Sequence, residues 1–491
     1  MSRHLPVLLV VVPLMAAPIA ALVMRARAAW LVALAASWWA FGVSLALLRR
    51  VLAEGVISYE LGGWAPPVGI EYRVDEANAF VILIVAAIGA IVVPFARQSV
   101  EAEVSEDRGA LFYSAFILCL TGLLGIAVTG DVFNVFVFLE ISSLSAYALI
   151  ALGPDRRALT ASYQYLILGS VGATFIVIGI GLMYVMTGTL NMADLAERLP
   201  AVSGTRTIPV AFTFLTVGIT LKLALFPLHL WLPNAYAYAP SAVTAFIAAT
   251  ATKVAVYLLL RFFFTIFGAA FSFDTMQLDR ILMPLALVAI LSMSLVAVYQ
   301  RNVKRLLAYS SVAQIGYMVL GISFASVLGV SAGILHLFNH ALIKGALFMA
   351  LGCVMYRVGS VRLDSMAGLG RAMPWTMAAF VVGGLSLIGV PLTVGFVSKW
   401  YLVQAALEQG NWPVAAVVLM GSLLAVVYVW KVVEVAYFGE VSPEAGIREA
   451  PLGLLVPTWT LVLANLYFGI DASLTAGVAT RAAEVLIGGL P

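Results

Sequence analysis

DVFNVFVFLEISSLSAYALIALG, residues 131–153, is an apolar run that carries an acidic residue, Glu140, well inside it. The run is long enough to cross a bilayer, which takes roughly 20 mainly apolar residues. Charged groups inside membrane helices are rare, and they usually face a polar interior or pair with another charge. The stretch therefore predicts a membrane-spanning helix whose carboxylate faces the inside of a helix bundle.

The composition of the whole chain agrees with this interpretation. Of its 491 residues, 63% are hydrophobic and 10% are charged, whereas a soluble domain is about 25% charged. This excludes a soluble enzyme, a nucleic-acid-binding protein and a secreted module, so we expect no nucleic-acid partner. Cys119 and Cys353 lie in apolar runs without the spacing of a metal site, so neither a disulfide framework nor a bound metal is predicted.

The apolar runs predict an all-α polytopic membrane protein with about fourteen transmembrane helices. The first run resembles a signal peptide, but further apolar runs follow it directly, so we interpret it as a span. The polar stretches 49–76 and 187–207 are short enough to be surface loops. The predicted spans cover residues 5–24, 28–48, 77–96, 111–130, 132–152, 160–186, 208–231, 241–265, 280–299, 304–323, 328–356, 375–400, 413–438 and 452–472.

Two stretches of the chain resemble one another and suggest an internal repeat. Residues 163–189 and 336–360 both close on a Met-Tyr pair followed by a glycine. Interrupted segments at corresponding places in two halves point to broken helices at a transport site. The alternative is that apolar helices resemble each other by composition alone. The next apolar run after each stretch carries a lysine and a proline: Lys222 with Pro227, and Lys399 with Pro391.

The lysines are concentrated in the apolar runs. Of the six lysines, only Lys304 falls plainly in a predicted loop. A lysine at the centre of a membrane helix costs ~2.5–3.5 kcal/mol, so the others are expected to face a polar interior. A buried lysine can release its proton, whereas arginine effectively cannot, and this favours proton transport. The five lysines inside apolar runs are Lys222, Lys253, Lys344, Lys399 and Lys431.

Three of the four histidines also lie in apolar runs. His336, His340 and Lys344 follow at i, i+4 and i+8 and therefore line one face of one helix. Imidazole titrates near neutral pH and is suited to relaying protons. Serine, threonine and glutamine side chains near the charged residues can hold bridging waters. The third histidine, His229, lies close to the end of its span, where a structural role is an equal alternative.

The deep charges have a functional and a structural interpretation. Glu140 needs a cation, and Lys222 is the natural candidate. The structural alternative is a buried ion pair, or a side chain that reaches the membrane surface near a helix end. For Lys431, a pair with Glu434 is such an alternative. We favour proton transfer for the residues deepest in their runs: Glu140, Lys222, Lys253 and Lys399.

Five motifs in the sequence resemble one known family. They occur in the same order in the antiporter-like subunits of respiratory complex I, of Mrp-type sodium/proton antiporters and of membrane-bound hydrogenases. The resemblance covers about residues 75 to 440. They read DVFNVFVFLEISSLSAYALIA (131–151), LKLALFPLHLWLPNAYAYAPSAVTAFIAATATKVAVYLLLR (221–261), RNVKRLLAYSSVAQIGYMVLG (301–321), HLFNHALIKGALFMALG (336–352) and GVPLTVGFVSKWYL (389–402).

The resemblance implies fourteen transmembrane helices with two inverted five-helix repeats, helices 4–8 and 9–13, in which helices 7 and 12 are broken. It divides the chain into an N-terminal three-helix segment (1–110), two repeats that each form a proton half-channel (111–265 and 280–438), and a C-terminal helix and tail (452–491). By motif position, Glu140 matches the helix 5 glutamate.

The other proton-translocating residues follow from the same motifs. Lys222 matches the helix 7 lysine that pairs with the glutamate, and Lys253 matches the helix 8 lysine that begins a central hydrophilic axis. His340 matches the helix 11 histidine, and His336 and Lys344 accompany it in some branches.

The last motif helps to separate the branches of the family. Lys399 matches a helix 12 position that is lysine in some branches and glutamate in others. This lysine and the length of the chain favour similarity to the Mrp D subunit.

Two functions remain open. The first is a proton-translocating membrane subunit of a multisubunit Na⁺/H⁺ antiporter, similar to the Mrp D subunit, which is a transporter subunit and not an enzyme. The alternative is an antiporter-like subunit of a complex I-like NADH:quinone oxidoreductase or of a membrane-bound hydrogenase. The sequence contains no iron–sulfur or dinucleotide-binding motif, so we expect no cofactor in this chain. A passive scaffold fits poorly with five lysines in apolar runs.

The expected partners are other membrane subunits, the lipid bilayer and H⁺, with Na⁺ as a candidate ion. The sequence leaves open whether Na⁺, K⁺ or H⁺ alone is exchanged, and in which direction protons move. We expect a multi-pass protein of the inner (plasma) membrane. Outside the spans, thirteen lysines and arginines fall in odd-numbered loops and nine in even-numbered loops and termini. Basic loops stay in the cytoplasm, so both termini are predicted on the non-cytoplasmic side.

Overall fold

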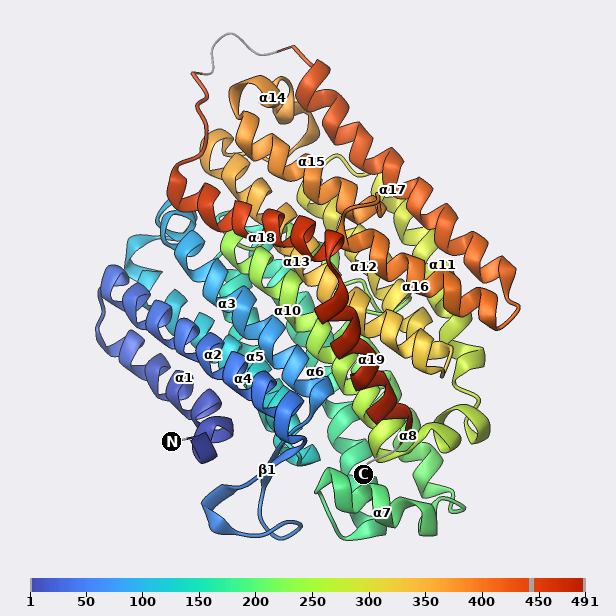
Figure 1. The fold of residues 1–491 in the computed structure, drawn as a ribbon. Helices are drawn as coiled ribbons and strands as arrows, with labels where there is room; N and C mark the ends of the chain where they lie inside the picture. The colour runs from blue at the N-terminus through green and yellow to red at the C-terminus, as the bar shows by residue number, and fades with distance from the viewer. Residues whose placement is uncertain (1, 441–445, 489–491) are drawn as a thin grey trace.

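The structure is a computed structural model that describes residues 2–440 and 446–488. The chain forms a bundle of helices that cross the molecule in one general direction (Figure 1). The helices are α1 (Leu5–Leu22), α2 (Ala26–Glu54), α3 (Glu76–Glu103), α4 (Gly109–Val128), α5 (Val132–Ala151), α6 (Arg157–Thr187), α7 (Met192–Val202), α8 (Thr207–Leu223), α9 (Leu232–Tyr238), α10 (Ser241–Leu260), α11 (Asp279–Val298), α12 (Val303–Ser323), α13 (Val327–Val358), α14 (Leu369–Ala372), α15 (Pro374–Ile388), α16 (Val394–Glu408), α17 (Trp412–Phe438), α18 (Leu452–Ile470) and α19 (Ser473–Gly488).

Among the described residues, twelve helices are long and apolar enough to cross a membrane alone. Two shorter apolar helices, α8 and α15, are the first halves of broken spans that α9 and α16 continue. Together they give the fourteen spans that the sequence predicts, with breaks in the seventh and twelfth. The second half of the seventh span lies beyond the predicted limit at residue 231, because α9 begins only at Leu232.

Local backbone geometry ends the first half of each broken span. α8 stops where Ala224 adopts a left-handed conformation with φ 61°, and the following residues contain Pro227, which has no amide hydrogen to continue a helix. α15 stops at Gly389, whose φ of 93° favours glycine, and Pro391 follows. The lysine–proline pattern therefore coincides with a real interruption in each case.

The two repeats share the same backbone contacts. The long helices α6 and α13 both end in a glycine with φ 71°, Gly188 and Gly359. α5 is the fifth span and α12 the tenth, so they cross the bundle in opposite directions and the repeats are inverted. Each repeat also contains one antiparallel backbone bridge. In the first repeat Asp131, at the start of α5, pairs with Asn191 in the loop after α6. In the second repeat Asn302, at the start of α12, pairs with Arg362 in the loop after α13.

Several elements lie outside the predicted spans. Residues 49–76 were expected to form a loop, but they contain the end of α2 and an antiparallel hairpin of β1 (Ile57–Glu60) and β2 (Glu71–Val74). The expected loop 187–207 contains the short helix α7, and α19 follows α18 in the expected tail. Short or amphipathic elements of this kind lack the long apolar run that identifies a span.

A buried ion pair fastens the start of α3 to the end of α10. The Arg261 guanidinium lies 2.5 Å from the Asp75 carboxylate, and its Nε donates to the Tyr257 hydroxyl at 2.9 Å. Asp75 also caps α3 by accepting from the amides of Ala77 and Asn78. Removing one member of such a buried pair typically costs about 3–5 kcal/mol, so this contact holds the hairpin end of the molecule to its centre.

α13 lies at the centre of the bundle and packs against α10, α12, α15, α16 and α18. Both chain ends lie at the same end of the bundle as β1 and α7 (Figure 1). We call this end the lower face and the opposite end, which carries the α5–α6 and α13–α14 connections, the upper face. The burial of α10, α12 and α13 places their polar side chains inside the protein, away from lipid.

Candidate functional site

The structure brings Glu140 of α5 and Lys222 of α8 together. The Lys222 Nζ lies 3.7 Å from Glu140 Oε1, and it donates to the hydroxyls of Ser143 at 2.9 Å and Tyr147 at 3.4 Å. The Lys222 side chain is 6% exposed and that of Glu140 is 29% exposed. Three residues of one α5 face, at i, i+3 and i+7, therefore surround the lysine amine.

Glycines of α6 make room for this lysine. A methyl group at Gly169 would overlap the Tyr147 hydroxyl and would lie 3.5 Å from Lys222 Nζ. Lys222 belongs to the last turn of α8, where the helix dipole favours a positive charge. The Trp231 indole donates to the main-chain oxygen of Leu221 at 3.1 Å, which closes the broken end of α8. The broken end of α8 and the close approach of α6 at Gly169 thus both lie next to the Lys222 side chain.

Lys253 lies fully buried in the middle of α10. Its amine donates to the main-chain oxygen of Ala248 at 2.5 Å and to the Thr252 hydroxyl at 3.4 Å. In the part of the chain that the structure describes, no carboxylate lies within ion-pair distance of this amine. Lys253 is therefore held by neutral groups, unlike Lys222.

The two histidines of α13 have different surroundings, although both are fully buried. His336 is bonded on both sides, at 2.8 Å to Ser398 Oγ and at 2.8 Å to Gln314 Oε1. His340 has no hydrogen-bond partner at either ring nitrogen among the described residues. Their rings are stacked with centroids 6.2 Å apart. His336 is thus fixed in orientation, whereas the His340 nitrogens are free to bond to water.

Lys344 continues the same helix face toward α12. Its amine donates to the Leu307 main-chain oxygen at 2.8 Å and to the Ser310 hydroxyl at 2.5 Å. His340 lies one turn from His336 and one turn from Lys344 on the same face of α13. His340 is therefore flanked by His336 and Lys344.

Lys399 lies at the break of the twelfth span. From α16 its amine donates to the main-chain oxygens of Leu387 at 3.0 Å and Ile388 at 2.9 Å, and to the Ser422 hydroxyl at 2.9 Å. These two carbonyls belong to the last turn of α15, which a cation stabilises. Gly389 leaves the space, because a methyl group there would lie 3.0 Å from the lysine side chain.

The predicted residues form two clusters. Among the described residues, no direct hydrogen bond or ion pair joins the Glu140–Lys222 cluster to the central cluster around Lys253. Buried tyrosines lie next to both clusters: the Tyr147 ring packs edge-on against the Tyr165 ring, with centroids 4.6 Å apart. The Tyr236 hydroxyl donates to the main-chain oxygen of Ile247, on α10, at 3.4 Å. A proton passing between the clusters would need these hydroxyls or water.

The structure differs from the sequence interpretation at two lysines. Lys431 does not form the pair with Glu434 that was the structural alternative for it; its amine donates to the main-chain oxygens of Val298 at 2.9 Å and Gln300 at 3.2 Å, at the end of α11. Lys304 is not in a loop, because α12 begins one residue earlier, and its side chain is buried. Both corrections have the same cause: neighbouring helices supply main-chain oxygens that the sequence does not reveal.

Several polar partners escaped the sequence analysis. Tyr147, Tyr317, Ser398 and Ser422 each contact one of the predicted residues; the Lys399 amine, for example, lies 5.0 Å from the centre of the Tyr317 ring. Tyr147 was detectable, since it shares a helix face with Glu140. The serines were not, because single serines are common in membrane helices.

As a whole, the site consists of groups that can take up and release protons inside a bundle that excludes lipid. Among the residues that the structure describes, no three His, Cys, Asp or Glu side chains are grouped to hold a metal ion. Lysines, histidines and hydroxyls joined by short steps suit a proton path.

Comparisons with known proteins identify the family of this chain. Residues 129–425 match the family described as NADH:quinone oxidoreductase/Mrp antiporter, TM. The chain is 41% identical to the NADH-quinone oxidoreductase subunit N of Desulforudis audaxviator (strain MP104C), covering 96% of both chains. It is 31% identical to the D subunit of the Na(+)/H(+) antiporter of Bacillus subtilis (strain 168), covering 91% of this chain and 89% of that protein.

A solved structure extends the similarity to the fold. A chain in the structure of the Mrp complex from Dietzia sp. DQ12-45-1b superposes with a TM-score of 0.90 at 28% identity, covering 99% of this chain and 97% of the other. Sequence and fold lead to the same assignment. This chain belongs to the NADH:quinone oxidoreductase/Mrp antiporter family of membrane proteins.

Proposed function

We propose that this chain is the proton-translocating membrane subunit of a multisubunit Na⁺/H⁺ antiporter, in the place of an Mrp D subunit. The observation that carries the proposal is the Glu140–Lys222 contact at the break of the seventh span. Beyond it lie buried lysines and histidines that, in the described residues, have no carboxylate within ion-pair distance. A chain of this kind can accept a proton and pass it on.

The first step uses the charge of Glu140. While the carboxylate is close, it stabilises the ammonium form of Lys222; when the two separate, a buried lysine releases its proton more readily. The hydroxyls of Ser143 and Tyr147 still bind the amine, so the lysine keeps its place after the carboxylate has moved.

The later steps pass through the central cluster. We propose that the proton reaches Lys253 through water and the buried tyrosines, and then His340, which has free ring nitrogens. His336 and Lys399 complete the path on one side, since Ser398 and Tyr317 bring them close together. Lys344 forms a branch toward α12.

A second candidate function has its own support. The higher identity is to a protein named NADH-quinone oxidoreductase subunit N, so the chain could serve as a proton-pumping subunit of a redox-driven complex whose electron carriers lie in other chains. The proton path would be the same in both complexes. What differs is the energy source, a cation gradient or electron transfer.

The partners and orientation follow from the same argument. We propose that the chain assembles with other membrane subunits, as the relatives named as subunits do. We also propose that it lies in the plasma membrane with its upper face in the cytoplasm. Thirteen lysines and arginines lie in or next to the helix connections of the upper face, against nine for the lower face and termini.

The test is to purify the tagged chain with its native partners and identify them by mass spectrometry. The complex is then placed in vesicles, and proton movement is followed with a pH-sensitive dye after addition of Na⁺, of K⁺, or of an electron donor and a quinone. Movement driven by Na⁺, with membrane subunits alone as partners, supports the antiporter. Movement only with the electron donor, and co-purifying iron–sulfur proteins, supports the redox complex. No proton movement under any condition would contradict both.

A further inference from the structure

A cavity of about 180 Å³ opens on the upper face where the two repeats meet. Its lining comes from the end of α3, from the α5–α6 connection, from the junction of α9 and α10, from the start of α12, and from the end of α13 with the loop after it. Two of the charged residues that line it, Glu103 and Lys304, belong to none of the clusters described above. Lys304 is buried, which is unusual for a charge at the beginning of a helix near a protein surface.

Ser241 joins these two charges. The Lys304 amine donates to the Ser241 hydroxyl at 3.0 Å and to the Ala239 main-chain oxygen at 3.3 Å. The Ser241 hydroxyl and amide both bond to Glu103 Oε2, at 3.1 and 3.0 Å. The other carboxylate oxygen accepts from Ser99 at 2.8 Å. An ammonium, a hydroxyl and a carboxylate are therefore connected in one hydrogen-bonded chain at the cavity.

This chain leads toward the central cluster. Leu307 follows Lys304 by three residues, about one helical turn, on α12. Its main-chain oxygen accepts from the Lys344 amine at 2.8 Å. Ser310, on the next turn, also accepts from Lys344. Lys304 and the groups that bind Lys344 thus lie on consecutive turns of α12, and water between them would complete the connection.

The other charged and titratable groups that face the cavity are not available for this role. The Arg157 guanidinium donates to Asp155 at 2.5 Å and holds the pKa of that carboxyl at about 2, so Asp155 stays ionised. Arg157 also donates to the Tyr238 hydroxyl at 3.3 Å, and Arg362 cannot release its proton at working pH. Glu103 is the acid at this cavity that is held by serine hydroxyls and a main-chain amide.

We propose that Glu103, Ser241 and Lys304 form the port through which protons pass between the upper face and Lys344. The proposal rests on the proton-translocating function proposed above. In the outward step, one N–H bond of the Lys304 ammonium breaks as the proton moves to the serine oxygen. The serine proton moves to the carboxylate at the same time. The hydroxyl is restored, a neutral amine and a neutral carboxylic acid result, and the acid then releases its proton to water in the cavity. In the reverse direction the Glu103 carboxylate takes a proton from that water and passes it through Ser241 to the neutral Lys304 amine.

A structural role is the competing explanation, because Glu103 bonds to the first amide of α10 and so also caps that helix. The two roles predict different effects of substitution. Glu103→Gln keeps an oxygen that can accept from the Ser241 amide but cannot carry a proton. Ser241→Ala removes the bridge and leaves both charges, whereas Ser241→Thr keeps the hydroxyl. Lys304→Arg keeps the positive charge but not the ability to release a proton.

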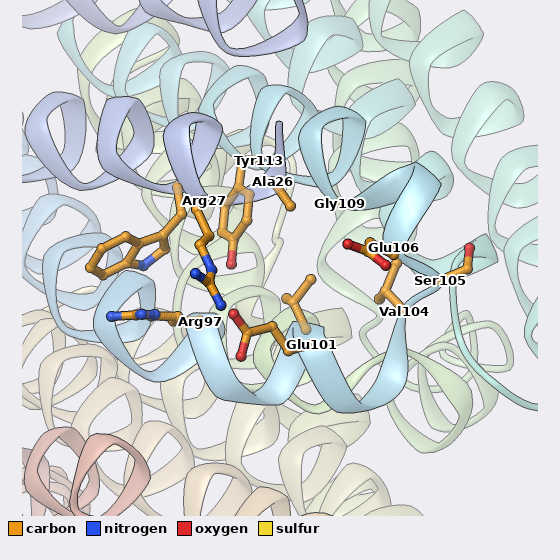
Figure 2. A pocket seen from close by; sticks show the side chains of 11 residues that line it. Ala26, Arg27, Arg97, Glu101, Val104, Ser105, Glu106, Gly109 and Tyr113 are labelled. Carbon is orange, nitrogen blue, oxygen red and sulfur yellow. The ribbon is translucent and has the colours of Figure 1, made fainter. Parts of the chain in front are cut away.

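A neighbouring glutamate provides the matched control. Glu101 lies two residues before Glu103 on α3 and is exposed. It lines a separate cavity, where Figure 2 shows its carboxylate directed toward Arg27. Glu101→Gln makes the same chemical change at the same end of the same helix, without touching Ser241 or Lys304. It therefore reports any general effect of removing a negative charge from this face.

The experiment measures the initial rate of proton movement by the assembled complex in vesicles, with the pH varied on one side at a time. Lys304→Arg cannot release its proton and should lower the rate at every pH while assembly stays normal. For Glu103→Gln and Ser241→Ala we expect the half-maximal rate to shift by about one pH unit toward acid, on one side only. Ser241→Thr and Glu103→Asp, which keep the hydroxyl and the carboxylate, should shift it less, and Glu101→Gln should keep the profile of the unaltered complex.

Two outcomes would overturn the port. One is an unchanged pH profile on both sides in Glu103→Gln and Ser241→Ala. The other is an equal loss of rate at every pH, together with reduced assembly, which is the signature of a lost helix cap. Loss of transport in Glu140→Gln at every pH shows that the proposed function holds in the same preparation. If the unaltered complex moved no protons, that result would instead reject the proposed function itself.

Discussion

The Lys222 amine lies 3.7 Å from the Glu140 carboxylate, farther than the 2.9 Å of its hydrogen bond to Ser143. The amine thus hydrogen-bonds to a neutral hydroxyl, while the acid acts on it by charge at a longer distance. A buried pair with ideal geometry would keep its proton permanently, since both charges stabilise each other strongly in a medium of low dielectric constant. The longer distance leaves Glu140 able to move without leaving Lys222 unbonded.

The first prediction concerns this pair. Glu140→Gln and Lys222→Ala should each abolish proton movement in vesicles. The first variant lacks the carboxylate that controls the charge of the lysine, and the second lacks the lysine itself. Assembly is followed by gel filtration of the purified complex, since leaving one buried charge unpaired is itself destabilising. Glu434→Gln, at an exposed glutamate of α17, is the control and should transport normally. Full activity of either pair variant would refute the coupling.

The second prediction concerns Lys253, which is bonded only to Ala248 and Thr252 among the described residues. Lys253→Arg keeps the positive charge but holds its proton far more tightly. If Lys253 relays protons, arginine should block transport as completely as alanine, and Lys253→His should retain part of the rate with a shifted pH optimum. The rates are measured as a function of pH in vesicles. An arginine variant with the native rate would show that Lys253 serves only as a fixed positive charge.

The third prediction concerns Lys399 and depends on pH. Its amine donates to two carbonyls at the end of α15, a position where an ionised carboxylate is disfavoured. Lys399→Glu should therefore be more active than Lys399→Ala at low pH, where the acid is protonated and can donate. This advantage should disappear as the pH rises and the acid ionises. Equal rates of the two variants across the pH range would indicate that Lys399 has a structural role.

The fourth prediction concerns the space beside Lys222. Gly169→Ala would place a methyl group in overlap with the Tyr147 hydroxyl, so Tyr147 and Lys222 must shift. Overpacking of this kind costs about 1–3 kcal/mol. We expect a lower melting temperature of the detergent-solubilised protein and a reduced transport rate. Gly181→Ala in the same helix has no atom within 4 Å of the added methyl group and should change neither; equal effects of both variants would contradict the steric explanation.

Much of the architecture is determined by the sequence. Hydropathy locates the spans because each one is a local property of about 20 consecutive residues. The breaks in the seventh and twelfth spans coincide with Pro227 and Pro391, whose effect on the backbone is also local. The amphipathic helix α7 and the β1–β2 hairpin were missed, since neither contains a long apolar run.

The sequence also determined which side chains would lie in polar surroundings. Five lysines inside apolar runs cannot face lipid, because the free-energy cost of placing them there would be too high. Their partners were decided only by the tertiary structure. Lys431 bonds to the end of α11 and not to the nearby Glu434. Lys304 is buried against Ser241, which lies 63 residues earlier in the chain. Hydrogen bonds of this kind depend on how closely helices distant in sequence approach each other, and a single sequence contains no record of that distance.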